Sequence, residues 1–165
     1  MKEKGYVLLE SMVAITMVTV GLLGIFALLS RSLSLNRVVA DRYVAAYLAA
    51  EGLELVKNII DNNLVQERPW NEGVTSGQYE IDFESGRLTA CGSPCAARFF
   101  YFDPQTKTYS YESRPESRET RFERVVKIAL TADGEEVRVN SAVNWTTRGG
   151  GRFLVNLEDH FFNWR

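Results

Sequence analysis

The uncharged stretch from Ser11 to Ser30 constrains this chain more than any other feature of its 165 residues. It contains no Asp, Glu, Lys or Arg, and most of its residues are Val, Leu, Ile, Met or Phe. A helix of about 20 residues, at roughly 1.5 Å per residue, extends about 30 Å, which is the thickness of the hydrocarbon core of a bilayer. The sequence therefore predicts a transmembrane helix near the N-terminus.

Two alternatives fit this stretch less well. Lys2 and Lys4 precede it, as in a secretory signal peptide, but the apolar run exceeds the roughly 7–15 residues of such a signal and no small-residue cleavage site follows. A buried core helix that is apolar all round would lack partners in so small a protein. Charge leaves the orientation open, because Arg31, Arg37 and Arg42 balance the two leading lysines.

Glu10 is the one charged residue between Gly5 and Ser30. A carboxylate at the centre of a bilayer costs about 2.5–3.5 kcal/mol, and less near the membrane surface. One interpretation places Glu10 at the interface, where the positive N-terminal end of the helix favours it. The other pairs it with a positive group in a filament.

The segment from Lys4 to Ser11 resembles the prepilin-type N-terminal cleavage and methylation motif of type IV pilins, type II secretion pseudopilins and competence pseudopilins. That motif has a short basic leader ending in Gly, an aromatic residue, three mostly apolar residues and Glu, followed by an uncharged helix. The resemblance implies that a prepilin peptidase cuts between Gly5 and Tyr6 and methylates the new amine of Tyr6. It also implies that Glu10 neutralises the N-terminal amine of a neighbouring subunit.

Two positions depart from the usual motif. The first mature residue is usually Phe and is Tyr6 here, and Ala27 stands where many pilins carry Pro. The second departure predicts a straighter helix, or bending at Gly21 and Gly24.

The helical pattern continues from Ser34 to Leu64 with one apolar stripe at spacings of three and four. The stripe consists of Ala45, Leu48, Gly52, Leu55, Val56, Ile59 and Ile60. We expect this helix to pack on a sheet and to end at Asp61–Asn63, before Pro69. The stretch 45–54 also resembles the helix of the minor-pilin subgroup.

From about Gln78 the apolar period changes to two, which is typical of strands. Strands are expected at 78–83, 98–102, 108–111, 122–131, 136–146 and 152–157, with a hairpin turn at Asp133-Gly134. We predict an α+β fold in which a meander of antiparallel strands lays its apolar face on the helix. This half resembles the type IV pilus modification proteins and minor pseudopilins through 120–124, Val143-Asn144-Trp145, Leu157 and Asn163-Trp164.

Four parts follow: a leader at 1–5, a transmembrane or filament-core helix at 6–30, its amphipathic continuation at 31–64 and a sheet domain at 65–165. The resemblance implies that together they form a pilin fold. The domain would lie outside the cytoplasmic (inner) membrane, anchored by one span, and later in a filament at the cell surface or in the periplasm.

Cys91 and Cys95 are the only cysteines, and we favour a small disulfide loop over free thiols or a metal site. His160 is the only histidine, and we expect no catalytic triad, metal or cofactor.

Arg114, Arg118, Arg121 and Arg124 could suggest a DNA-binding patch. Four glutamates alternate with them, however: Glu112, Glu116, Glu119 and Glu123. We therefore expect a solvated, internally neutralised segment, and DNA as a partner is disfavoured.

These patterns predict a structural subunit rather than an enzyme: a minor pilin or pseudopilin that starts or caps a filament. Its expected partners are the prepilin peptidase, other subunits that contact its N-terminal helix, an inner-membrane assembly platform and, before assembly, membrane lipid. The alternative is a membrane-anchored binding or adhesion domain that never polymerises, which would need neither Gly5 nor Glu10.

Overall fold

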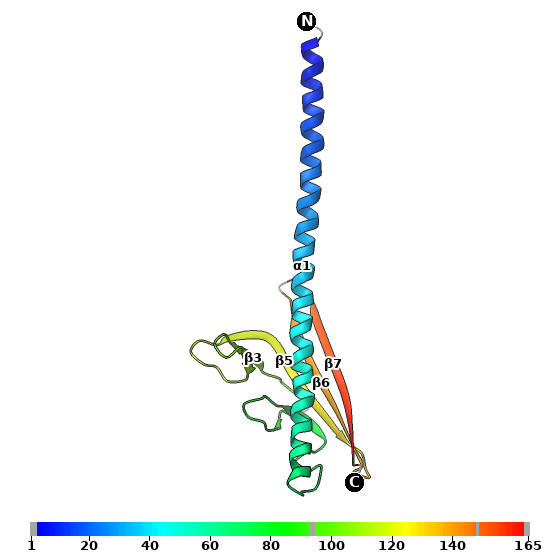
Figure 1. Ribbon diagram of the computed structural model, residues 1–165, viewed down its shortest axis with the longest axis vertical. Coiled ribbons are helices and arrows are strands. Elements are labelled where there is room, and N and C mark those ends of the chain that lie inside the picture. Colours follow the sequence, from blue (N-terminus) through cyan, green and yellow to red (C-terminus); the bar gives the residue numbers. More distant parts are fainter. Residues whose placement is uncertain (1–2, 93–94, 148, 164–165) are drawn as a thin grey trace. The chain divides into compact units, whose positions relative to one another are not determined.

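The computed structural model describes residues 3–92, 95–147 and 149–163, with side chains from Tyr6 onward, and in these residues one helix precedes seven strands (Figure 1). The helix, α1, spans Glu3–Val65 without interruption. The strands form one antiparallel sheet, so the chain combines a long N-terminal helix with a C-terminal sheet, as an α+β fold requires. Met1, Lys2 and Trp164, which the sequence analysis used, lie outside the described residues.

The chain divides into two units, Met1–Asp41 and Arg42–Arg165. The first contains the N-terminal part of α1. The second contains the last part of α1 together with the whole sheet, so the helix residues after Arg42 belong to the same unit as the strands. The predicted boundary at residue 30 is not marked by any break in the helix.

The end of α1 is fixed by a buried asparagine. The side-chain amide of Asn63 donates hydrogen bonds to the carbonyl oxygens of Trp70 (3.2 Å) and Glu72 (2.8 Å). The backbone carbonyl of Asn63 accepts from the backbone N–H of Arg68, and Glu67 takes a left-handed conformation at φ 57°. The predicted stop signal therefore acts by tying the chain that leaves the helix back onto its last turn.

Most strands lie where the alternating pattern predicts them. Their bounds are β1 Gly77–Glu80, β2 Thr89–Ala90, β3 Phe99–Asp103, β4 Thr108–Ser110, β5 Arg118–Leu130, β6 Glu136–Thr146 and β7 Arg152–Phe162. The hairpin turn after β5 has Gly134 at φ 73°, a conformation that glycine adopts without strain. Four strands differ from the prediction: β1 ends before Ile81, β5 begins at Arg118 instead of Phe122, β7 continues beyond Leu157, and β2 was not predicted.

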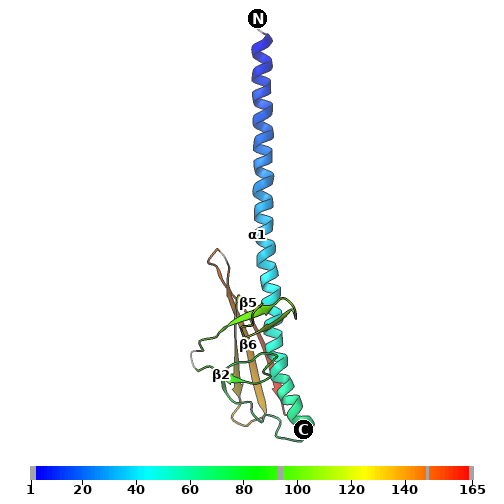
Figure 2. The same ribbon diagram turned by 90° about the vertical axis from the view of Figure 1, so that its left-hand side faces the viewer.

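The prediction of a simple meander is wrong for the first half of the sheet. β5 has 13 residues, and two shorter strands share one of its edges: β3 pairs near its start, with Phe102 opposite Arg118, and β1 near its end, with Gly77 opposite Ile128. β6 takes the other edge, and only β5, β6 and β7 follow one another as a meander (Figure 2). A strand long enough to hold two partners end to end makes this arrangement possible.

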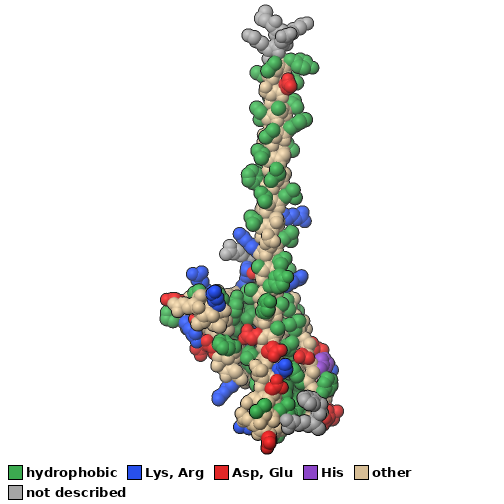
Figure 3. Space-filling view, viewed as in Figure 1, with side chains coloured by type: hydrophobic (Ala, Val, Ile, Leu, Met, Phe, Trp, Pro, Cys, Tyr) green, Lys and Arg blue, Asp and Glu red, His purple; other side chains and the backbone are tan. Residues whose placement is uncertain are grey.

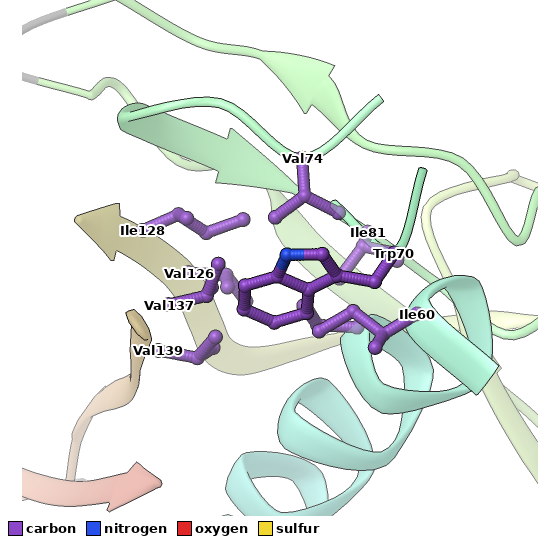
Figure 4. Close-up of a cluster of buried hydrophobic side chains, with 9 residues drawn as sticks. Ile60, Trp70, Val74, Ile81, Val126, Ile128, Val137 and Val139 are labelled. Atoms are coloured by element: carbon purple, nitrogen blue, oxygen red, sulfur yellow. The ribbon is translucent and has the colours of Figure 1, made fainter. Parts of the chain in front are cut away.

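The last part of α1 buries its apolar stripe against one face of the sheet, the inner face. One core cluster is centred on Trp70, which lies between Ile60 of α1 and the valine and isoleucine side chains of β5 and β6 (Figure 4). A second cluster joins Ala45, Leu48 and Ala49 of α1 to Phe100, Phe122 and Trp145 of the sheet and to Tyr111, which follows β4. The predicted packing of helix on sheet is confirmed.

Gly52 allows the helix backbone to approach the sheet closely. A Cβ atom at this position would lie 3.1 Å from Cδ of Arg124 and would collide with the hydroxyl of Ser141. The glycine in the stripe therefore gives room to polar side chains of β5 and β6.

Candidate processing and assembly site

The N-terminal part of α1 exposes apolar side chains on every face. Between Tyr6 and Ser30 no described residue is buried, and Leu8, Phe26 and Leu28 keep 66–70% of their surface exposed. Figure 3 shows these side chains along the N-terminal part of the helix. In the part of the chain that the structure describes, α1 is the one helix long and apolar enough to cross a membrane. So large an apolar surface requires a bilayer or apolar neighbours.

Three hydroxyl side chains of this segment are satisfied within the helix. The hydroxyls of Ser11, Thr16 and Thr19 donate to the carbonyl oxygens four residues earlier, at 2.7–2.8 Å. An unpaired hydroxyl in an apolar medium is costly, and this local bonding removes the cost. These three residues therefore suit a helix that is surrounded by lipid or by other apolar helices.

Glu10 differs from these hydroxyls. It lies on α1 among exposed apolar neighbours, and its carboxylate forms no hydrogen bond or ion pair with any residue that the structure describes. No described residue thus compensates the only charge between Tyr6 and Ser30.

Gly5 and Tyr6 both lie within α1, and the Tyr6 side chain is 78% exposed. The helix continues without a break through Gly21, Gly24 and Ala27, and a Cβ atom at either glycine would meet no atom within 4 Å. The structure gives both glycines an open environment on a continuous helix.

The two cysteines form a disulfide, with an S–S distance of 1.99 Å and a Cα–Cα distance of 5.0 Å. Gln78 of β1 holds both ends of this small loop, because its carbonyl and side-chain oxygens accept from the backbone N–H groups of Cys91 and Cys95. Arg98 follows the loop and forms an ion pair with the buried Glu80 at 2.8 Å. The loop is thus pinned to β1 on both sides.

The expectation of a solvated arginine segment is wrong for Arg124, which is fully buried. Its guanidinium donates to the carbonyl oxygens of Leu48 (2.5 Å) and Ile81, and lies 4.9 Å from the centre of the Phe100 ring. Arg124 therefore connects α1, the chain after β1 and the aromatic core. The other arginines of the segment lie nearer the surface, and Arg114 pairs with Glu84 (2.6 Å) and Asp103 (3.7 Å).

Two acidic side chains face the buried arginine from different elements. Glu51 of α1 lies 3.8 Å from it, and burial raises the pKa of Glu51 more than the nearby positive charge lowers it. Asp82 is also buried, which would raise its pKa, but hydrogen bonds from Ser85 and Tyr111 outweigh this effect and the pKa of Asp82 is lowered. The arginine charge is thus compensated inside the domain.

His160 lies on β7 between two carboxylates. Its Nδ1 atom is 2.6 Å from Glu136 of β6, and its Nε2 atom is 3.1 Å from Glu158. Hydrogen bonds to Glu158 and Glu136 raise the pKa of His160 above its ordinary value of 6.5. No nucleophile takes part in this arrangement of described side chains, which fits a surface ion cluster better than a catalytic triad.

We expect Glu136→Gln to lower the pKa of His160, because a neutral amide stabilises the imidazolium less than a carboxylate does. In the native chain the stabilisation from this cluster is complete below about pH 6.5, and is lost as the pH rises through the raised pKa. His160 is the only histidine, so one imidazole proton resonance in an NMR titration reports the change. An unchanged midpoint in the Glu136→Gln chain would show that this carboxylate does not hold the proton.

No group of three or more described His, Cys, Asp and Glu side chains is arranged to hold a metal ion.

The chain was also compared with known proteins. No protein-family profile matches it, and no curated protein or solved structure is significantly similar to it.

Proposed function

We propose that this chain is a minor pilin or pseudopilin, a filament subunit that is made as a prepilin and acts in initiation or at the filament tip. The observation that carries the proposal is the exposed apolar segment of α1 from Tyr6 onward, directly after the glycine of a prepilin-like leader. In the proposal this helix is held first by membrane lipid and later by the helices of other subunits. The C-terminal domain, with a pilin fold, stays outside the cytoplasmic membrane.

The carboxylate of Glu10, which pairs with no described residue, supports this function over a plain membrane anchor. Cleavage after Gly5 would create a positive amine on Tyr6, and a buried amine and a buried carboxylate offset one another when they pair. A neighbouring subunit can supply the amine, so each added subunit would satisfy one Glu10. In a simple anchor the carboxylate would gain only the attraction of the positive N-terminal end of the helix.

The C-terminal domain supports a structural role. Arg124 is buried, and Arg98 and Arg114 are paired with carboxylates, so these three arginines are committed to internal contacts. DNA is therefore not part of the proposal. The remaining proposed partners are the prepilin peptidase, other pilin or pseudopilin subunits and an inner-membrane assembly platform.

The test is the intact mass and N-terminal sequence of the protein from cells with and without a prepilin peptidase. With the peptidase, we expect the chain to start at Tyr6 and to carry one added methyl group. Without it, we expect Met1–Gly5 to remain. If the leader remains in both strains, the subunit proposal is wrong and a non-polymerising, membrane-anchored binding or adhesion domain takes its place.

A further inference from the structure

β7 forms one edge of the sheet and is long for an edge strand. It pairs with β6 from Arg152, opposite Thr146, to Phe162, opposite Glu136, and no described strand pairs with its other side. The unpaired side of a strand presents backbone N–H and C=O groups that can bind another extended chain.

The register shows which residues face this open side. The carbonyl of Gly151 accepts from Thr147 and the N–H of Asn163 donates to Glu135, so the odd-numbered residues between them turn their backbone groups toward β6. The even-numbered residues turn theirs outward, and their side chains lie on the sheet face away from α1. These residues are Arg152, Leu154, Asn156, Glu158, His160 and Phe162.

The second half of the edge is protected against pairing. The outward N–H of His160 is already bound to the carboxylate of Asp159 at 2.8 Å. Glu158 adds a second negative charge, which Asn140 and His160 hold in place. Charged side chains and occupied donors are the means by which proteins block strand addition.

The first half differs, because it carries one positive side chain, Arg152, and no carboxylate. No described side chain accepts from the outward N–H groups of Arg152, Leu154 or Asn156. The Leu154 side chain is 57% exposed, and Arg152 forms no ion pair with a described residue. Open donors, an exposed apolar side chain and an uncompensated positive charge thus occur together on residues 152–156.

A second copy of this chain fits the open edge poorly. Antiparallel pairing of two β7 strands could place Arg152 opposite Glu158, but that register includes the blocked half of the edge. Pairing confined to residues 152–156 would place Arg152 opposite Asn156 and leave its positive charge without a carboxylate.

We propose that residues 152–156 of β7 bind an extended segment of a different protein, which adds to the sheet as an antiparallel strand. The backbone groups of Arg152, Leu154 and Asn156 supply the hydrogen bonds. The segment presents an acidic side chain to Arg152 and an apolar side chain to Leu154. Its pairing stops before Glu158, where the edge is blocked.

The experiment uses the full chain in its own membrane, with the photoreactive residue p-benzoylphenylalanine in place of Leu154. The matched control carries it in place of Phe162, which lies on the same strand and face and is 55% exposed. We expect the first chain to form an adduct with one non-helical, acidic segment of one protein, and the control to form none with that segment.

Two further variants test whether backbone pairing holds the segment. Asn156→Pro removes an outward N–H without breaking a bond to β6, and should lower the adduct yield about tenfold, whereas Asn156→Ala should retain it. Arg152→Glu should lower the adduct yield, because its carboxylate repels an acidic segment. If limited proteolysis shows that the proline variant is misfolded, the yield from Arg152→Glu tests the proposal in its place.

Equal adducts from positions 154 and 162, no protein adduct from position 154, or full adduct in a folded Asn156→Pro chain would each overturn the proposal. The adduct is scored in membranes and requires neither leader cleavage nor a filament. A chain that keeps its leader but forms the adduct would therefore refute the filament subunit and leave the strand-binding edge intact.

Discussion

Arg124→Met is expected to lower the free energy of unfolding of the domain by about 3–5 kcal/mol, because it removes one partner from a buried charged network. The loss would leave the carbonyl oxygens of Leu48 and Ile81 without their donors, inside the protein. It would also leave Glu51 without its positive neighbour, although burial already raises the pKa of Glu51. A domain with a total stability of about 5–15 kcal/mol would be close to unfolding.

The control is Arg138→Met on β6, the same substitution at a side chain that is 51% exposed. Urea unfolding of the full chain in detergent, followed by the fluorescence of the buried Trp70 and Trp145, compares the two variants with the native protein. We expect a shift of less than about 0.5 kcal/mol for the control. Equal effects at the two positions would show that the buried arginine contributes nothing special to stability.

Glu10→Ala is expected to leave membrane insertion intact and to reduce incorporation into filaments more than about 100-fold. The substitution makes the apolar segment more apolar, so insertion is not impaired. In the assembled state it would leave the amine of a neighbouring Tyr6 buried without its carboxylate, and breaking a buried pair costs about 3–5 kcal/mol. The ratio of protein in sheared filaments to protein in membranes measures the effect at native expression levels.

Glu54→Ala is the matched control, because it removes the same group from an exposed position of the same helix. Its only described ion pair is with Lys57 at 3.9 Å, and such surface pairs contribute little. We expect normal incorporation of this variant. Normal incorporation of Glu10→Ala as well would show that Glu10 has no role in assembly.

Local sequence patterns predicted the secondary structure well where burial alternates strictly. The predicted strand 136–146 matches β6, and burial alternates along it from Val137 to Trp145. The strand predicted at 78–83 ends early, because Asp82 turns back to accept the N–H of Ser85 and leaves the sheet. The pairing of β1 and β3 on one edge of β5 could not be predicted, because it depends on the length of a strand that begins in a charged segment.

The sequence pattern around Arg124 could have predicted that this residue is buried. Arg124 follows Phe122 and precedes Val126 and Ile128 at spacings of two, so all four side chains lie on the same, apolar face of the predicted strand. The interleaved glutamates led instead to the prediction of a solvated segment. Charge balance describes how a segment behaves in water, whereas strand parity decides which side chains enter the core.

The candidate site depends on the sequence in two different ways. The leader, Tyr6 and Glu10 are adjacent in the chain, so a local motif is enough to bring them together. The contact of His160 with Glu136 could be predicted only if the register between β6 and β7 were known, because the pairing of these strands brings the two side chains together. Residue spacing alone does not provide that register.

The packing of the last part of α1 decides where the protein can be cut and remain folded. Ala45, Ala49 and Val56 are fully buried in the core, whereas the residues before Asp41 contribute nothing to it. A protease that cleaves just before Arg42 would separate the apolar segment of α1 from a domain that keeps both of its core clusters. Cleavage a few turns later, within the buried stripe, would instead destroy the domain, so the apolar helix can be removed without unfolding only within a narrow part of the chain.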